Sequence, residues 1–270
     1  MRALARIAAE ARRDGGTRLT TLAGQAPLLL RQTSTEQDPP AGPGSARETG
    51  AAQVYLVGGA AGPLGGDELR YTVELGPGAD VRVRSAAASL VLPGPHEGES
   101  TLDITARVGD GARLSWSPQP MIVARGARHR TTVHLDLAAS ARLIWREEIL
   151  LGRHGEPPGS VAARLRVRRE GRVLLDHTLA AGPRYPGSLD AAVTAGDTAI
   201  GTLVIVDPDW ARVPPADRLP LPTRDDVGGA LAVMPLPGPA VVVSALAPDG
   251  LTLRRLLEPG RAWRLTDYEY

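Results

Sequence analysis

The 270-residue chain contains no cysteine and no phenylalanine, and all of its basic side chains other than histidine are arginine. The absence of cysteine excludes disulfides, thiolate metal ligands and cysteine nucleophiles, so His, Asp, Glu and Met are the remaining candidate metal ligands. With 31 basic against 30 acidic residues, the formal net charge is +1. No chain-wide field therefore attracts polyanions, and we expect no nucleic-acid partner.

Long apolar runs are also absent. No stretch approaches the length of about 18 apolar residues that a membrane-spanning helix needs. The first residues carry charges at Glu10, Arg12 and Arg13 where a signal peptide would have its apolar core. We therefore expect a cytoplasmic protein with no membrane association.

Alternation of apolar and polar residues dominates from about residue 53 to residue 206. In the segment 69–75 (LRYTVEL), Leu69, Tyr71, Val73 and Leu75 fall on one face, which is typical of a half-buried strand. Similar patterns occur at 81–84, 102–104, 133–137 and 165–168. These segments predict an all-β domain.

A strand, a tight turn and a second strand recur along this region. Ala79, Ala112 and Ala141 each close such a turn and are 33 and 29 residues apart, and a looser fourth copy covers 167–173. Units of this length suit a stacked β-coil, because one unit cannot bury its apolar face alone. A large β-sandwich also strings hairpins together at such intervals, but we favour the layered, β-helix-like stack of antiparallel and mixed strands.

The ends of the chain and two loops have their own signals. Residues 3–13 and 17–22 flank a Gly-Gly turn and predict an N-terminal hairpin. Residues 34–50 have the composition of a mobile loop, and the prolines between 207 and 222 argue against a long helix. One or two short helices are expected near the C-terminus, one beginning at Pro248-Asp249-Gly250 and running to Leu257.

The glycine run 58–67 and the histidines give weak signals for chemistry. The run follows a strand, but it has neither the lysine nor the following helix of a phosphate-binding loop, so we interpret it as a sharp loop that aims Asp67 inward. The five histidines lack metal-binding spacings and are interpreted as single surface residues. They are His96, His129, His134, His154 and His177.

Carboxylates in strands are the stronger signal. Glu147 and Glu148 are adjacent in the strand 143–151, so one of them should face the apolar side, where a carboxylate needs a counter-charge or a cation. A structural ion pair with Arg146 or Arg153 is the simplest interpretation, and Asp176 raises the same question. A carbohydrate-active enzyme with Glu147 and Glu156 or Asp176 as an acid pair is one alternative. A metal-free β interaction module is another.

Three motifs occur in one order. They are GGDEL (65–69) followed by GPGA (76–79), LSWSPQPMI (114–122) followed by GAR (126–128), and LGR (151–153) followed by GE (155–156). Together they resemble the signatures of the UreD family of urease accessory proteins. Ser115 replaces the usual Glu of the second signature, and beyond residue 206 the match fades.

The resemblance implies a single UreD-like β domain over 1–270, with a divergent C-terminal part from 207, and a non-enzymatic role. Family members are scaffolds that bind UreF and the GTPase UreG, dock on the urease apoprotein (UreABC) and help convey nickel to its active site. No tightly bound cofactor is expected, only a transient nickel ion. By motif, the acidic positions of the nickel route fall on Asp67, Glu147 and Asp176.

Overall fold

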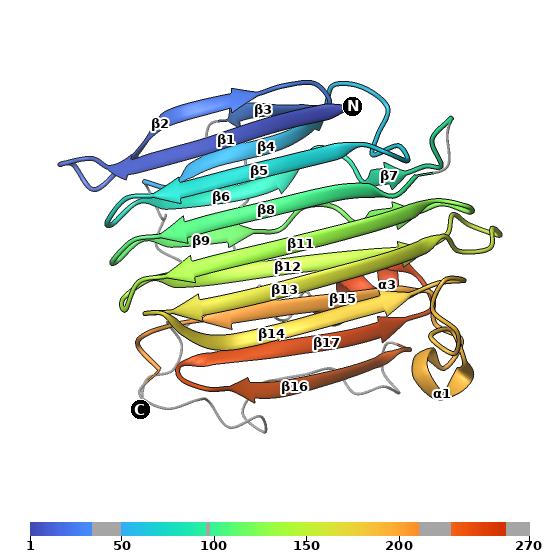
Figure 1. Cartoon of the computed structure of the whole chain (residues 1–270). Helices are drawn as coiled ribbons and strands as arrows, with labels where there is room; N and C mark the ends of the chain where they lie inside the picture. Colours follow the sequence, from blue (N-terminus) through green and yellow to red (C-terminus); the bar gives the residue numbers. More distant parts are fainter. Residues whose placement is uncertain (34–49, 96–97, 211–227, 258–270) are drawn as a thin grey trace.

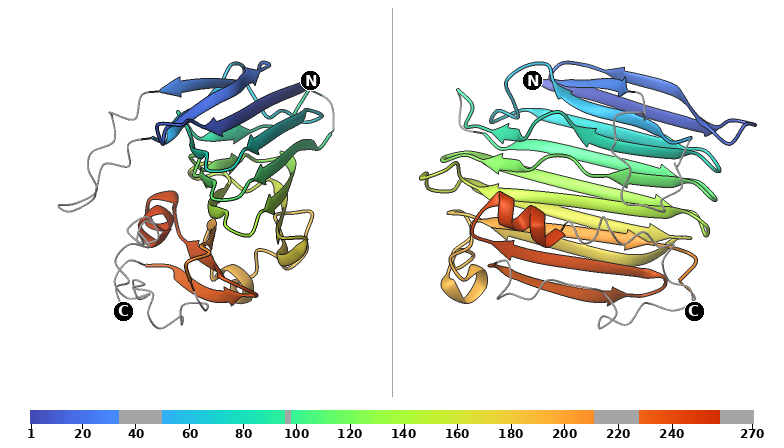
Figure 2. Two further views of the ribbon diagram at one scale, coloured as in Figure 1. Left: turned by 90° about the vertical axis from the view of Figure 1, so that its left-hand side faces the viewer. Right: turned by 180° about the vertical axis from the view of Figure 1, so that it is seen from behind.

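Two β-sheets face each other along the length of the molecule, and the chain passes from one to the other (Figures 1 and 2). The computed structural model describes residues 1–33, 50–95, 98–210 and 228–257. The predicted loop at 34–50 and the proline-rich segment therefore lie almost wholly outside the described residues.

The first sheet runs in the order β14-β13-β11-β8-β5-β1-β2. Its middle strands pair in parallel, and β2 and β14 close its ends by antiparallel pairing. The strands are β1 (Arg2–Ala11), β2 (Thr17–Gly24), β5 (Glu68–Leu75), β8 (Ser100–Val108), β11 (Arg128–Leu137), β13 (Ser160–Arg169) and β14 (Arg172–Ala181).

The second sheet runs in the order β16-β17-β15-β12-β9-β6-β4-β3, with the short strands β7 and β10 joined beside β12. Strands β4, β6, β9 and β12 are parallel, and the pairs beyond them are antiparallel. The bounds are β3 (Leu28–Thr33), β4 (Ala52–Gly58), β6 (Asp80–Ser85), β7 (Ser89–Val91), β9 (Arg113–Trp116), β10 (Met121–Val123), β12 (Arg142–Leu151), β15 (Ala199–Val206), β16 (Ala230–Leu236) and β17 (Ala240–Ala247).

The repeat predicted around the three alanines is the step from the first sheet to the second. Ala79, Ala112 and Ala141 are fully buried, and successive turns are hydrogen-bonded to each other. Arg113 N donates to Ala79 O at 2.8 Å, and Arg142 N donates to Ala112 O at 2.9 Å. The prediction of a layered, β-helix-like all-β stack is confirmed.

The fourth copy of the repeat behaves differently. Glu170 and Gly171 both have positive φ, 48° and 76°, and they close a hairpin. Strand β14 therefore returns antiparallel beside β13 instead of crossing to the second sheet. This hairpin ends the parallel coil.

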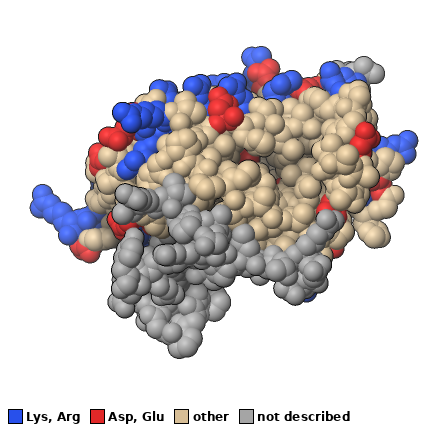
Figure 3. Space-filling view, turned by 90° about the horizontal axis from the view of Figure 1, so that it is seen from below, with Lys and Arg blue, Asp and Glu red and all other residues tan. Residues whose placement is uncertain are grey.

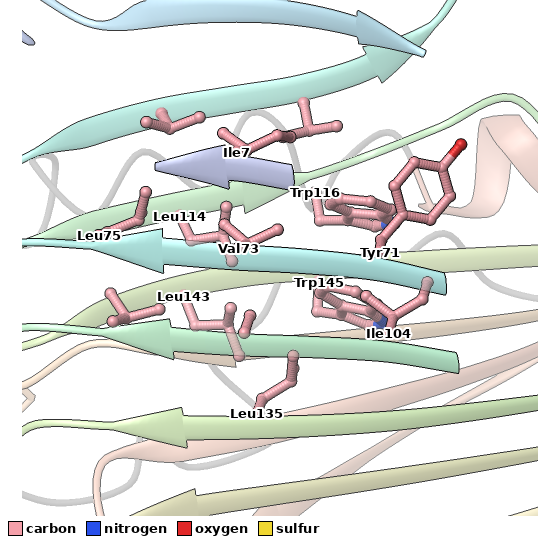
Figure 4. Packing of buried hydrophobic residues seen from close by; sticks show 14 of the residues in the cluster. Ile7, Tyr71, Val73, Leu75, Ile104, Leu114, Trp116, Leu135, Leu143 and Trp145 are labelled. Carbon is pink, nitrogen blue, oxygen red and sulfur yellow. The ribbon is translucent and has the colours of Figure 1, made fainter. Parts of the chain in front are cut away.

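The space between the sheets holds the main hydrophobic core (Figure 4). The predicted inward positions of β5 are all buried. At the centre, the Trp116 and Trp145 rings stack at a centroid distance of 5.0 Å, and Tyr71 meets Trp116 edge-on at 5.7 Å. These three rings link the two sheets, since Tyr71 belongs to the first and both tryptophans to the second.

The predicted N-terminal hairpin and the predicted helix ending at Leu257 are both present. The N-terminal hairpin is β1 and β2, and the C-terminal helix is α3 (Gly250–Leu257), with Asp249 Oδ1 accepting hydrogen bonds from Leu251 N and Thr252 N at 2.8 Å. A one-turn helix, α1 (Ala191–Thr194), precedes β15. Neither helix in the described ranges is long and apolar enough to cross a membrane.

Candidate functional site

A cavity of about 480 Å³ lies between the two sheets. Its walls are mostly aliphatic or small side chains, and its inner part is lined by Tyr71, Trp116, Thr131 and Glu147. Lining residues that are also exposed mark its mouth: Gly58, Ala60, Ala61 and residues 86–89. A space of this size suits a small ligand or a hydrated ion.

The second sequence signature holds one side of this mouth. Gln119 N donates to Ser85 Oγ at 2.8 Å, and Ser89 N donates to Pro120 O at 3.0 Å. The prolines on either side of Gln119 restrict its backbone. The motif therefore fixes the loop 85–89 against the cavity.

Glu147 is half-buried and, like its neighbour Glu148, lines the cavity. It lies on β12 on the same face as Trp145, while Glu148 points to the opposite face, as the alternation predicted. Burial raises the pKa of Glu147 to about 7. The Trp145 indole N–H offsets part of this shift without reaching ordinary hydrogen-bond geometry. No basic side chain among the described residues forms an ion pair with Glu147.

A second, much smaller cavity of about 10 Å³ is also lined by Glu147. It shares Glu147, Ile149 and Ala163 with the large cavity, and its other walls come from β13, β14 and β15. They are Leu165, His177, Leu179, Ile200 and Thr202. Glu147 therefore lies at the junction of a wide and a narrow space.

The narrow cavity is lined in part by β14, the edge strand of the first sheet. His177 lines this cavity and is also exposed. Seen from below, the surface at this end has a hollow near its centre, and the side chains around the hollow are mostly uncharged (Figure 3). The linings of the two cavities, which share Glu147, therefore extend from the mouth to His177.

Glu148 forms the ion pair that the sequence suggested for this pair of residues. Its Oε1 lies 3.1 Å from Arg146 Nε, and its Oε2 lies 3.7 Å from Arg254 Nη2 of α3. The same Arg254 Nη2 donates to the Gln119 side chain. This network connects the C-terminal helix to the cavity wall.

Asp67 is buried beside the mouth and not in the cavity. Its Oδ1 lies 2.7 Å from the Met1 ammonium, and its Oδ2 accepts a hydrogen bond from Leu64 N at 2.9 Å. Gly65 is required here, because a Cβ on it would lie 2.7 Å from Gly94 N. The Gly-Gly-Asp loop does aim Asp67 inward, as expected.

Asp176 lies on the outer face of the first sheet. Its two carboxylate oxygens accept hydrogen bonds from Arg164 Nε and Nη2, both at 2.9 Å, and these bonds hold its pKa below the usual range. The cause of this orientation is a β-bulge at Leu174, where the register with β13 shifts. The bulge turns His177, and not Asp176, toward the interior.

The three predicted acidic residues are thus not brought together. Over the described ranges, no three His, Asp or Glu side chains form a group that could hold a metal ion. The acid pair of the carbohydrate-enzyme alternative is not assembled either, because Glu156 and Asp176 line neither cavity. Arg153 hydrogen-bonds both oxygens of Glu156 and lowers its pKa to about 2, so the third signature closes a loop.

The interpretation of all histidines as surface residues is wrong for His129. Its side chain is 1% exposed, and its Nδ1 lies 2.8 Å from Ser100 Oγ. Burial lowers its pKa to about 4. Its place next to Arg128 and Arg130 in the sequence concealed this burial, but the strand alternation with Thr131 and Val133 could have revealed it.

Comparison with known proteins gives one family. The model of the UreD urease accessory protein family matches residues 2–268. The chain is 44% identical over 259 residues to the urease accessory protein UreD of Streptomyces coelicolor, covering 96% of this chain and 94% of that protein. It is 42% identical to that of Streptomyces avermitilis over 260 residues, covering 96% and 95%. Identity to that of a Parafrankia species is 43%, covering 94% and 86%.

Proposed function

From the premise that the chain belongs to the UreD family and has a role in urease maturation, we propose that it is a scaffold through which nickel passes to apo-urease. In this proposal it binds UreF, recruits UreG and docks on the urease apoprotein. The family implies a non-catalytic role. The nickel ion is cargo and not a resident cofactor.

One observation supports the route most directly. Glu147 is an ionisable carboxylate inside a cavity that opens to the surface, and no described basic residue pairs with it. A buried carboxylate without a counter-charge is costly. A passing divalent cation would supply that charge and would favour the ionised form of Glu147.

The mostly apolar walls suit passage better than storage. A site with few protein donors and open positions for water gives weak, reversible binding, whereas a closed set of four protein ligands would hold nickel tightly. Release toward urease requires weak binding. We therefore assign Glu147 the central position of the route, and the roles of Asp67 and Asp176 in it stay predictions.

Urease activation in cells tests the proposal. Urease and its accessory proteins are co-expressed with the wild-type chain, with Glu147→Gln or with Glu147→Ala, and the nickel content and activity of purified urease are measured. We expect both variants to lower nickel content while they still co-purify with UreF, UreG and urease. The exposed Glu74→Gln is the matched control and should behave as wild type.

Two outcomes contradict parts of this proposal. If the wild-type chain does not join the complex of accessory proteins and apo-urease, the scaffold role fails, and a metal-free module with other partners takes its place. If Glu147→Ala loads urease with as much nickel as the wild type does, the route through this cavity fails while the scaffold role stands.

A further inference from the structure

We propose that His177, together with Glu147 and Thr202, forms a nickel-binding point at the narrow end of the passage, where the ion exchanges water for protein ligands. This inference rests on the proposed nickel route and adds a second position to it. The three residues come from three strands of the two facing sheets, β14, β12 and β15.

Strand pairing places the three residues around one space. Glu147 and Thr202 are direct partners in the antiparallel pairing of β12 with β15 in the second sheet. His177 pairs with Leu165 in the first sheet, and both of these residues line the same narrow cavity as Glu147 and Thr202. Carboxylate, imidazole and hydroxyl groups therefore face one space from opposite walls.

The sizes of the two spaces explain why an ion would change ligands here. The wide cavity, about 480 Å³, has room for a divalent ion with its water shell. The narrow cavity has about 10 Å³, and a cavity needs roughly 10–15 Å³ to hold a single water. A hydrated ion must therefore lose water to move from one space to the other, and protein donors at the boundary replace it.

The donors present suit nickel. Imidazole nitrogen is a favourable ligand for Ni²⁺, and it binds more strongly than the carboxylate and hydroxyl oxygens that accompany it. In the described part of the chain, His177 is the one imidazole that lines either cavity. Its partial exposure at the end of the stack places it where an ion would leave the passage.

Asp176, the neighbour of His177, provides the internal comparison. Its carboxylate is held on the outer face by Arg164, with Arg166 Nε 3.7 Å from Oδ2. Strand alternation places these two adjacent residues on opposite faces, and the β-bulge at Leu174 sets which of them faces inward. Substitution at position 176 therefore changes the outer surface, and substitution at position 177 changes the passage.

The direct test is nickel binding to the tag-free, full-length chain. Ni²⁺ is paramagnetic, so titration with nickel chloride should broaden the imidazole NMR signals of His177 before those of the outward-facing His134. Glu147→Gln should weaken this effect. We expect His177→Gln to reduce nickel affinity at least about tenfold, the range seen when metal-site support is removed. Broadening that begins at other histidines and spares His177 would overturn the inference.

Urease activation separates this inference from the proposed function. We expect His177→Gln to lower the nickel content of urease, His177→Glu to restore part of it through its carboxylate donor, and His134→Gln, a substitution of an exposed, outward-facing histidine, to have no effect. If Glu147→Gln impairs loading and His177→Gln does not, the inference fails alone. If neither variant impairs loading, the route itself fails. A loss in His177→Gln that His177→Glu does not restore would indicate a structural role and overturn the inference.

Discussion

Glu147 and Thr202 lie directly opposite each other in the pairing of β12 with β15, and both line the narrow cavity, which shares Glu147 with the wide one. A carboxylate at this position has apolar side chains on most sides, which is why its pKa is raised. The same isolation that makes Glu147 costly to ionise makes it a point of attraction for a cation. Stability and cargo binding are therefore linked at this residue.

The raised pKa of Glu147 predicts a stability change in Glu147→Gln that depends on pH. A folded-state pKa of about 7 against an ordinary value of 4.5 means that this residue destabilises the wild type as pH rises from 4.5 through 7. The free energy of unfolding of Glu147→Gln, relative to wild type, should therefore increase over this window by up to about 3 kcal/mol. Urea unfolding at pH 5 and pH 8 measures it. A constant difference across pH would contradict the raised pKa of Glu147 in the folded chain.

A bulky residue at the mouth should block the passage without disturbing the core. Ala88 is exposed and lines the mouth, so Ala88→Trp should lower the rate and final level of urease activation while leaving the unfolding temperature unchanged. Ala192→Trp places the same side chain on an exposed site in α1, away from the cavity, and serves as the control. Equal activation with the two variants would show that nickel does not use this mouth.

Asp67→Asn should reduce stability more than Asp176→Asn, because the Asp67 carboxylate is buried and the Asp176 carboxylate is exposed. Asp67 is 3% exposed and bonds both the Met1 ammonium and Leu64 N, so Asp67→Asn should lower the free energy of unfolding by about 1–3 kcal/mol. Asp176→Asn breaks an exposed pair and should change stability little. Thermal unfolding measures both. Reduced nickel loading in a stable Asp176→Asn variant would instead support its predicted place in the route.

The sequence was sufficient to predict where most strands lie and which of their side chains are buried. Alternation in segments such as 69–75 reports burial directly, because successive side chains point to opposite faces of a sheet. The buried turn alanines predicted the stacking, because a repeat must bury its apolar face against its neighbours. The same alternation showed that only one of Glu147 and Glu148 could face the interior.

The sequence was not sufficient to predict side-chain direction next to a β-bulge, or contacts between residues far apart in the chain. Leu174 and Leu175 are both apolar, so nothing local shows which one is the extra residue of the bulge, and the bulge decides whether Asp176 or His177 faces inward. The partner of Glu148 in α3 lies far along the chain. The cavities depend on how two sheets fit together, which no strand pattern contains.

His129 should have the opposite pH effect from Glu147. Its pKa is lowered from 6.5 to about 4, so the neutral imidazole stabilises the fold above pH 6.5, and this contribution is lost as pH falls toward 4. In His129→Gln, the free energy of unfolding should no longer fall by up to about 3 kcal/mol across that window. Urea unfolding in the Glu147→Gln background measures this cleanly, because the two opposing slopes overlap in the wild type. If His129→Gln leaves the pH dependence of the free energy of unfolding unchanged, His129 is protonated in the folded protein and the lowered pKa is contradicted.

Arg254→Ala tests the connection between the C-terminal helix and the cavity wall. Arg254 bonds Gln119 and lies beside the fully buried Glu148 carboxylate. In the variant, Arg146 would be the one remaining counter-charge of Glu148 among the residues that the structure describes. We expect a loss of about 1–3 kcal/mol in the free energy of unfolding, since Arg254 is partly exposed and solvent screens it.

Hydrogen exchange locates the effect of Arg254→Ala within the fold. Amide protection should fall in α3 and in the loop 85–89, because Gln119 bonds Ser85 and loses its contact with the helix. Arg255→Ala, on the same helix, is the control and should leave the loop protected. If Arg254→Ala loosens α3 alone and the loop keeps its protection, the helix and the cavity mouth are not coupled through this network. If both loosen together, a protein that binds α3 has a physical means of changing the width of the mouth.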